Sequence, residues 1–151
     1  MSVIKSTKGE EGGAFQVDDF DPGSGCGCKH EDSKKLLKRA KHGHTRLYLW
    51  GMLIGIHGFV EFETECEECE SAQHWTADFG RTGSAWHGGR YCCSGCFDEK
   101  IIDVNRKVTL AKIKSTYDEY AAAHNNYNLF VFNCGPWANG FWAEIVKVIT
   151  A

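Results

Sequence analysis

Apolar residues recur at steps of three and four in two stretches near the C-terminus. Such spacing places side chains on one face of a helix, so we expect two amphipathic helices there. The first spans residues 109–124, with Thr109 as its N-cap and Asn125-Asn126 as its end. The second follows shortly after residue 133. Its expected buried stripe consists of Trp137, Phe141, Ile145 and Val148.

The most apolar segment is LYLWGMLIGIHGFVEF, residues 47–62. It is shorter than the ~20 residues needed to cross a bilayer, and glycines and a histidine interrupt it. We therefore expect two strands, residues 44–50 and 57–63, joined as a hairpin through GMLIG. Further strands are predicted at 127–132 and, as an edge segment, at 101–108.

Three other segments show weaker patterns. Residues 7–30 are rich in Gly, Asp and Ser, which predicts a loop or an arm. Ser33 is predicted to cap a short helix that runs to about His42 and ends at Gly43. Residues 64–97 are rich in Cys, Gly and His and show little periodicity, so they are interpreted as an insertion.

Size and composition predict one domain. The chain has 151 residues, of which 42% are hydrophobic and 25% charged, as in ordinary globular proteins. The prediction is an α+β fold over residues 1–151, with a small antiparallel sheet packed against helices. Residues 1–30 form a partly flexible arm in this prediction, and residues 64–97 a Cys-rich insertion.

Charge and the N-terminus limit the partners and the location. The formal net charge is −3 and the sequence contains no long basic block, which argues against nucleic-acid binding. The N-terminus is polar and lacks the apolar stretch of a signal peptide. We expect a protein made in the cytoplasm without a signal peptide and without a transmembrane segment.

A lone cysteine lies in the C-terminal segment NLFVFNCGPWANGFWAEIV. Pro136 suits the first turn of a helix, which puts Cys134 at the helix N-terminus. The helix dipole and unpaired N–H groups stabilise a thiolate there and lower a thiol pKa from its free value of ~8.5. Two interpretations stay open: a nucleophile, or a small buried residue at a strand end.

A thiol nucleophile needs a base, and the base needs a polar group that orients it. His44 opens the first strand of the predicted hairpin, in GHTRLYL, and His57 opens the second, in IHGFVEF. Either one alone would be interpreted as a half-buried histidine. Together with Cys134 they suggest a catalytic site.

The order of a histidine, a polar partner on the next strand and a distant Asn-Cys resembles the circularly permuted papain-like cysteine hydrolases. These include bacterial cell-wall peptidases and amidases and the lecithin:retinol acyltransferase-like enzymes. The resemblance covers residues 43–63 and 107–148; the Cys-rich insertion departs from it. It implies a permuted papain-like fold with Cys134 as nucleophile, His44 as base and His57 as orienting residue.

Glu61 is an alternative orienting residue, because a register shift of one residue swaps the faces of a strand. In either case, backbone N–H groups near Cys134 would stabilise the oxyanion that forms when the thiolate attacks a carbonyl group.

By the same resemblance, the expected function is cleavage of amide bonds through an acyl-enzyme. The expected substrate is a peptide, in particular peptidoglycan peptides cut by a bacterial toxin. Such a toxin would have an immunity protein as partner and would reach the periplasm or the outside through a specialised secretion system. A lipid acyltransferase or phospholipase with the same three residues is one alternative. A non-enzymatic zinc-binding interaction module, with Cys134 merely buried, is the other.

The remaining cysteines suggest a structural metal. Cys66 with Cys69 and Cys93 with Cys96 form two C-x2-C pairs, which resemble zinc knuckles. Disulfides are an equal alternative, since Cys26 and Cys28 supply further partners. His74 and His87 are further candidate ligands. No cofactor is expected for catalysis, because no signature of a catalytic zinc site is present.

Overall fold

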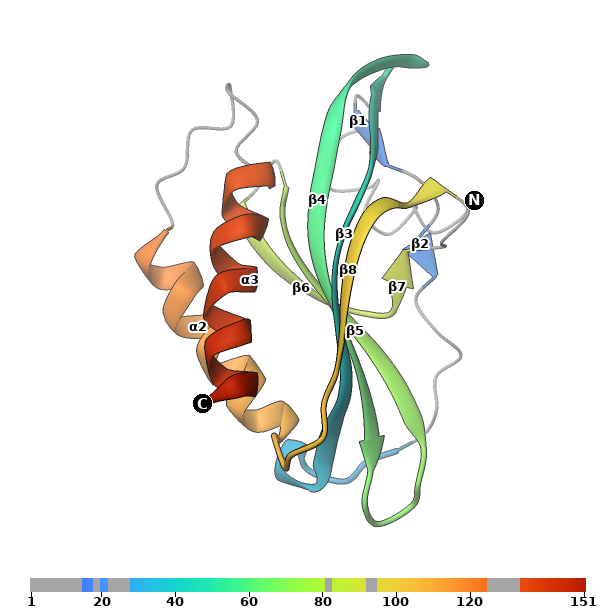
Figure 1. The fold of residues 1–151 in the computed structure, drawn as a ribbon. Coiled ribbons are helices and arrows are strands. Elements are labelled where there is room, and N and C mark those ends of the chain that lie inside the picture. The colour runs from blue at the N-terminus through green and yellow to red at the C-terminus, as the bar shows by residue number, and fades with distance from the viewer. Residues whose placement is uncertain (1–14, 18–19, 22–27, 81–82, 92–94, 125–133) are drawn as a thin grey trace.

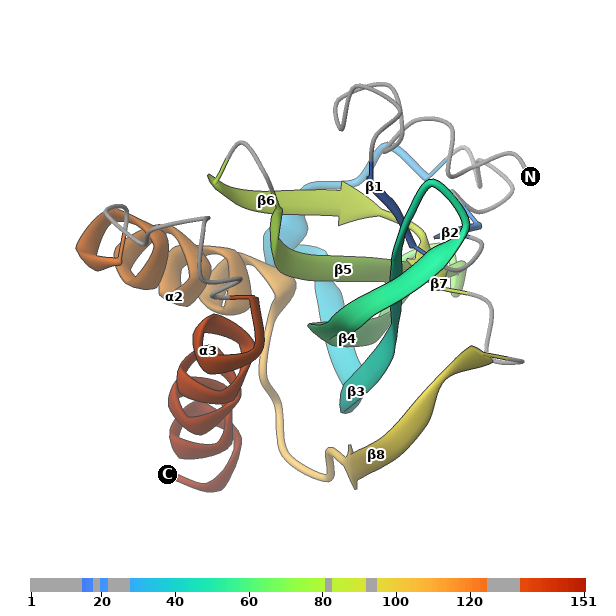
Figure 2. The same cartoon turned by 90° about the horizontal axis from the view of Figure 1, so that it is seen from above.

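The computed structural model describes residues 15–17, 20–21, 28–80, 83–91, 95–124 and 134–151. A curved antiparallel sheet lies at the centre, with two helices on one side and a small two-stranded sheet on the other (Figure 1). The same arrangement is visible from above (Figure 2). The fold is therefore α+β, as predicted.

Four strands form a meander in the order in which the chain makes them. They are β3 (Lys35–Leu49), β4 (Met52–Cys66), β5 (Ala72–Gly80) and β6 (Gly83–Gly88). Two further strands pair with the free edge of β3, namely β1 (Phe15–Val17) near its end and β8 (Phe97–Asp103) along its middle. The small sheet consists of β2 (Phe20–Asp21) and β7 (Arg90–Tyr91), and a single 3-10 turn, η1 (Asp32–Lys34), precedes β3.

Both predicted helices are present. The first is α2 (Leu110–Ala123), and the Thr109 hydroxyl accepts a hydrogen bond from the Lys112 N–H at 3.2 Å, so Thr109 is its N-cap. The second is α3 (Cys134–Thr150). Of its predicted stripe, Trp137, Phe141 and Ile145 are fully buried and Val148 partly so.

The main core lies between the helices and one face of the sheet, here called the helix face. Its members include Ala40, Val60, Phe62, Ala77 and Phe79 from the strands and Leu110, Ile113, Trp137, Phe141 and Ile145 from the helices. The two helices approach closely at Gly140, which has no side chain. The Cβ of any larger residue there would collide with the Tyr120 hydroxyl. That hydroxyl donates to the Trp137 carbonyl at 3.0 Å. The opposite side of the sheet, facing β2 and β7, is here called the far face.

The predicted short helix from Ser33 to about His42 is wrong. Only η1 is helical there, and β3 begins at Lys35. This part of β3 pairs with β4 on one edge and with β8 on the other. Those two ladders satisfy its backbone groups, and tertiary pairing outweighs the local helical pattern.

Residues 64–97, interpreted above as a Cys-rich insertion with little periodicity, include β5, β6 and β7. The predicted hairpin is confirmed, but its strands are longer and its turn lies at Trp50-Gly51. GMLIG therefore belongs mostly to β4. The predicted edge segment at 101–108 is a strand only through Asp103. The predicted strand 127–132 lies outside the described residues.

Within the described ranges, no helix is long and apolar enough to cross a membrane.

Candidate metal centre and candidate catalytic face

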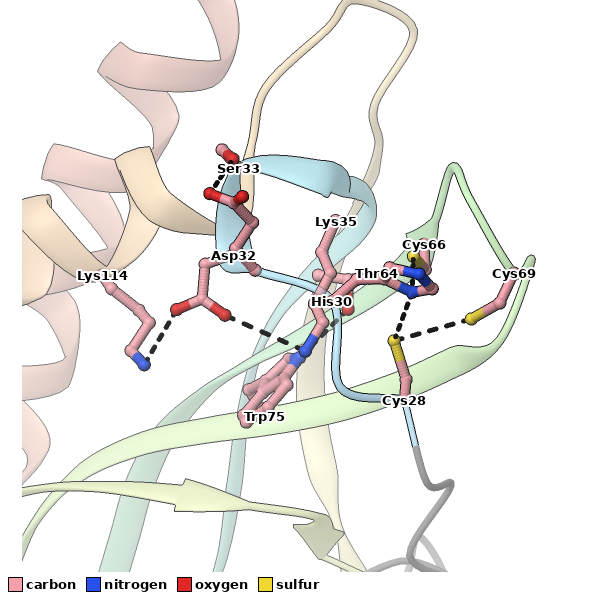
Figure 3. A network of polar contacts seen from close by, with 11 residues as sticks. Cys28, His30, Asp32, Ser33, Lys35, Thr64, Cys66, Cys69, Trp75 and Lys114 are labelled. Atoms are coloured by element: carbon pink, nitrogen blue, oxygen red, sulfur yellow. Dashed lines mark hydrogen bonds and ion pairs between the residues drawn. The ribbon is translucent and has the colours of Figure 1, made fainter.

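Four side chains from two distant segments converge near the base of the β4–β5 turn (Figure 3). Cys28 and His30 precede η1, Cys66 ends β4, and Cys69 lies in the turn. Their ligand atoms all lie within 4.8 Å of one another. The Nδ1 atom of His30 is 3.4 Å from the sulfur of Cys66 and 3.7 Å from that of Cys28, and the sulfurs of Cys69 and Cys28 are 3.5 Å apart. This donor set can hold one metal ion.

Backbone hydrogen bonds shape the turn that presents two of these sulfurs. The Glu70 N–H donates to the Cys66 carbonyl at 2.8 Å, and the Cys66 N–H donates to the Ser71 carbonyl at 3.0 Å. Glu70 takes a left-handed conformation, with φ at 62°. The Glu68 N–H lies 3.4 Å from the Cys66 sulfur.

The surroundings of the Cys69 sulfur favour its thiolate form, which is the form that binds metals. The Ser71 hydroxyl, 2.8 Å from the Cys69 sulfur, and the Ser71 backbone N–H lower the pKa of Cys69 to about 6. The pKa of Cys28 is raised: the His30 N–H lowers it, but burial and the two nearby thiols outweigh this effect. Cys69 is thus ionised at a lower pH than Cys28.

Two of the four predicted metal ligands, Cys66 and Cys69, belong to this group. Cys96 does not; it packs against Phe59 and Tyr91 on the far face. Cys93 lies outside the described residues. Cys66 and Cys69 are not disulfide-bonded. The structure thus pairs the first C-x2-C with Cys28-x-His30, and the short Cys-x-His motif was the signal available in the sequence.

His44 lies on the helix face of β3, where α3 packs. It pairs with Gly58 across the hairpin, and its ring lies 5.0 Å from that of His42, two positions earlier on the same face. The His42 ring in turn stacks on Trp142 of α3 at 5.7 Å. Cys134 is the first residue of α3, so its predicted place at a helix N-terminus is confirmed. The strand that bears His44 and the helix that begins at Cys134 therefore pack against each other.

His57 and Glu61 do not orient His44, which corrects both predicted choices. His57 pairs with Thr45 and Glu61 with Lys41, so their side chains leave β4 on the far face. There the His57 Nε2 contacts Asp78 at 3.0 Å, and Glu61 forms an ion pair with Lys41 at 3.4 Å. The register differs by one residue from the one that the catalytic arrangement requires.

Asp98 of β8 is the carboxylate nearest to His44 in the ion pairs of the described residues. Its Oδ2 lies 3.9 Å from the His44 Nδ1, an atom that is buried and makes no hydrogen bond there. The pairing of β3 with β8 shifts register between His42 and His44, and Asp98 takes a left-handed φ of 51°. Such bulges re-aim a side chain and are common beside active sites. This contact could not be predicted from the sequence, because only the β3–β8 pairing creates it.

His42 is a buried imidazole without a hydrogen bond on either ring nitrogen, within the part of the chain described. Burial, then the charges of His44 and Lys100, lower its pKa to about 4; Asp98 opposes this effect. His42 is therefore neutral at physiological pH.

This environment predicts acid sensitivity. The unfolded chain binds a proton at His42 below pH 6.5, whereas the folded chain does so only near pH 4, so stability falls as the pH drops between these values. The loss is about 3 kcal/mol. His42→Phe preserves the stacking on Trp142 and should remove this part of the slope when urea unfolding is measured at pH 7 and pH 4.5. An unchanged slope in the variant would exclude His42 as its source.

No protein-family model, no curated protein and no solved structure matches this chain.

Proposed function

We propose that this protein is a cysteine hydrolase of amide bonds whose fold is held by a structural zinc ion. One observation carries the enzymatic part: His44 lies on the sheet face against which α3, the helix that begins at Cys134, is packed. The zinc part rests on the four converging donors.

Zinc suits the chemistry of the donors Cys28, His30, Cys66 and Cys69. Three sulfurs and one imidazole nitrogen form one of its common structural ligand sets. In a tetrahedral site, Zn–S bonds of ~2.3 Å and Zn–N bonds of ~2.0 Å put sulfurs about 3.8 Å apart and sulfur and nitrogen about 3.5 Å apart. The distances of 3.4–3.7 Å between these ligand atoms are close to those edges. All four positions are filled by protein, so this zinc would be structural.

In the proposed reaction, the Cys134 thiolate attacks the carbonyl carbon of an amide. The His44 imidazolium protonates the leaving amine as the C–N bond breaks, which leaves a thioester. His44 then takes a proton from water, the resulting hydroxide attacks the thioester, and the acid and thiol are released. Asp98 orients the His44 ring through Nδ1, which leaves Nε2 for the thiol. The proposed substrate class is peptides, including those of peptidoglycan.

Transfer or hydrolysis of lipid acyl groups at the same residues is the second candidate function. One observation favours it: the β3–β4 hairpin exposes Trp50, Met52 and Leu53 to solvent. An enzyme that acts on lipids needs such a surface to reach its substrate. A zinc-binding interaction module without activity is the remaining alternative.

Substrate and activity are tested together. The protein is incubated with purified peptidoglycan and, separately, with phospholipid vesicles, and released fragments or fatty acids are measured. Cys134→Ala is expected to reduce the rate by about a thousandfold or more on whichever substrate is cleaved. Full activity of that variant would exclude both enzyme proposals. Absence of activity on either substrate, with zinc bound, would favour the interaction module.

The role of Asp98 is tested by Asp98→Asn, which preserves shape and removes the charge. We expect a fall in kcat of about tenfold to a hundredfold and a shifted pH profile, because the imidazolium at His44 loses its partner. Asp103→Asn, on the same strand and paired with the exposed Arg39, is the matched control and should leave kcat unchanged. Equal kcat values for both variants would remove Asp98 from the mechanism.

A further inference from the structure

The β3–β4 hairpin extends beyond β5 and β8, and the short strand β1 pairs with the last three residues of β3. Its neighbour β5 pairs with β4 only from Phe59 onward, and β8 pairs with β3 only as far as His44. Residues 52–56 therefore pair with β3 alone among the described strands. Figure 1 shows the hairpin passing the ends of both helices, at the end of the molecule where α3 begins. Residues 50–56 are here called the tip.

The tip exposes large apolar side chains. Trp50 is 81% exposed, Met52 70%, Leu53 58% and Ile56 53%. Together with Ile101 of β8 they are the exposed large hydrophobic residues of the described chain. Four of these five residues therefore gather at one protruding point, whereas surface apolar residues in a soluble protein are usually scattered.

The apolar surface surrounds the tip. Met52 and Leu53 are neighbours in a strand, so their side chains point to opposite faces, yet both are exposed. Trp50 lies in the turn between the strands with φ at 50°, followed by Gly51 with φ at 82°. Asn, Asp or Gly is the usual first residue of such a turn, and a bulky side chain there is strained. A flat protein partner would cover one face, whereas a lipid layer surrounds whatever enters it.

The charges near the tip suit a lipid surface. From Thr45 to Val60 the sequence contains no acidic residue, and Arg46 is exposed. Arg46 precedes Trp50 by four positions, about 13 Å along an extended strand. Interfacial segments bury their apolar side chains roughly 5–10 Å into the boundary between headgroups and acyl chains. At that depth, Arg46 would stay at the level of the phosphates.

We propose that the tip inserts into the interface of a lipid bilayer, with Trp50, Met52 and Leu53 among the acyl chains and Arg46 at anionic headgroups. Tryptophan favours this interface because its ring is apolar and its N–H is polar. The inference does not depend on the proposed hydrolase, since it uses none of the residues of that site.

Co-sedimentation of the full chain with vesicles tests the proposal. We expect binding to equimolar phosphatidylcholine and phosphatidylserine, and weaker binding to phosphatidylcholine alone. Trp50→Ser and Leu53→Ser should each lower the partition constant by about tenfold, since each removes one inserted apolar side chain. Ile101→Ser is the matched control, an equally exposed apolar residue outside the tip, and should bind as the parent does.

Tryptophan fluorescence tests whether Trp50 enters the lipid. The parent should show a blue shift of its tryptophan emission with vesicles, and Trp50→Phe should still bind while losing most of that shift. Binding that survives Trp50→Ser together with Leu53→Ser would overturn the proposal, and so would absence of binding. Self-association that those two changes abolish, without vesicle binding, would assign the tip to a second copy of the chain instead.

Discussion

Replacement of Cys66 by serine is expected to release the zinc ion and to lower the free energy of unfolding by at least about 3 kcal/mol. Structural zinc contributes ~10–16 kcal/mol of apparent binding free energy in small zinc peptides, so a fraction of that energy suffices. Cys66 is 1% exposed, and its sulfur lies beside His30 and the Glu68 N–H. A serine there removes a thiolate ligand and leaves a buried hydroxyl.

The effect on the fold follows from what the metal would connect. Cys28 and His30 lie in the segment before η1, and Cys66 and Cys69 at the β4–β5 turn. Within the described chain, the Glu67 N–H joins the β4–β5 turn to η1 instead, at 2.9 Å from the Lys34 carbonyl. Without zinc, we expect the segment before η1 to detach first. The meander should remain folded, because its core lies on the helix face.

Metal content and thermal unfolding provide the test. The purified parent should contain one zinc ion per chain, and a chelator should lower its Tm by roughly 6–12 °C, as a loss of about 3 kcal/mol predicts at this size. Cys96→Ala is the matched control, a cysteine outside the group that should retain the metal. A parent protein without bound zinc, whose Tm a chelator does not change, would show that these thiols have another role.

The helices were predictable from sequence because each has one buried face. Leu110, Ile113 and Tyr120 in α2, and Trp137 and Phe141 in α3, are buried, while most residues next to them in the sequence are partly or fully exposed. That contrast produces the period of 3.6 residues on which the prediction depends. The N-cap at Thr109 was also predictable, because Thr109 immediately precedes Leu110, the first apolar residue of the periodic pattern.

The strand β5 was missed because both of its faces are covered. Thr76, Ala77, Asp78 and Phe79 are all buried, the odd positions on the helix face and the even positions on the far face. A strand buried on both faces shows no alternation of polar and apolar residues. Two of its buried residues are also polar, which made the segment resemble a loop.

The sites were predictable only where their residues are close in sequence. The C-x2-C motif of Cys66 and Cys69 predicts a metal site by itself. Its partners Cys28 and His30 precede Cys66 by more than thirty positions in the sequence. The contact of Asp98 with His44 depends on a bulge, and the direction of His57 depends on a register fixed within one residue. No local pattern encodes either of them.

Substitution of Asp78 by asparagine is expected to lower the free energy of unfolding by about 3–5 kcal/mol. Asp78 is 3% exposed and accepts three hydrogen bonds, from the Nε2 atoms of His57 and His87 at 3.0 and 3.1 Å and from the Tyr91 hydroxyl at 2.7 Å. An ionised carboxylate only accepts, so both imidazoles donate through Nε2. An asparagine amide would turn a donor toward one of these donors and leave a buried group unsatisfied.

The network joins four strands on the far face. His57 comes from β4, Asp78 from β5 and His87 from β6, and Tyr91 brings β7 with it. Burial alone would raise the pKa of Asp78, but the two histidines outweigh it and hold the pKa well below its ordinary range. The carboxylate is therefore charged at every pH at which the protein is expected to act.

The pH dependence separates this explanation from a loss of packing. The unfolded chain protonates Asp78 near pH 3.8 and the folded chain only at lower pH, so the carboxylate stabilises the fold above that pH and less below it. The difference in urea unfolding between the parent and Asp78→Asn should be full at pH 7 and smaller at pH 3. Asp103→Asn, in the exposed pair with Arg39, should change stability by less than about 1 kcal/mol. A difference that is as large at pH 3 as at pH 7 would show that shape, and not charge, makes Asp78 necessary.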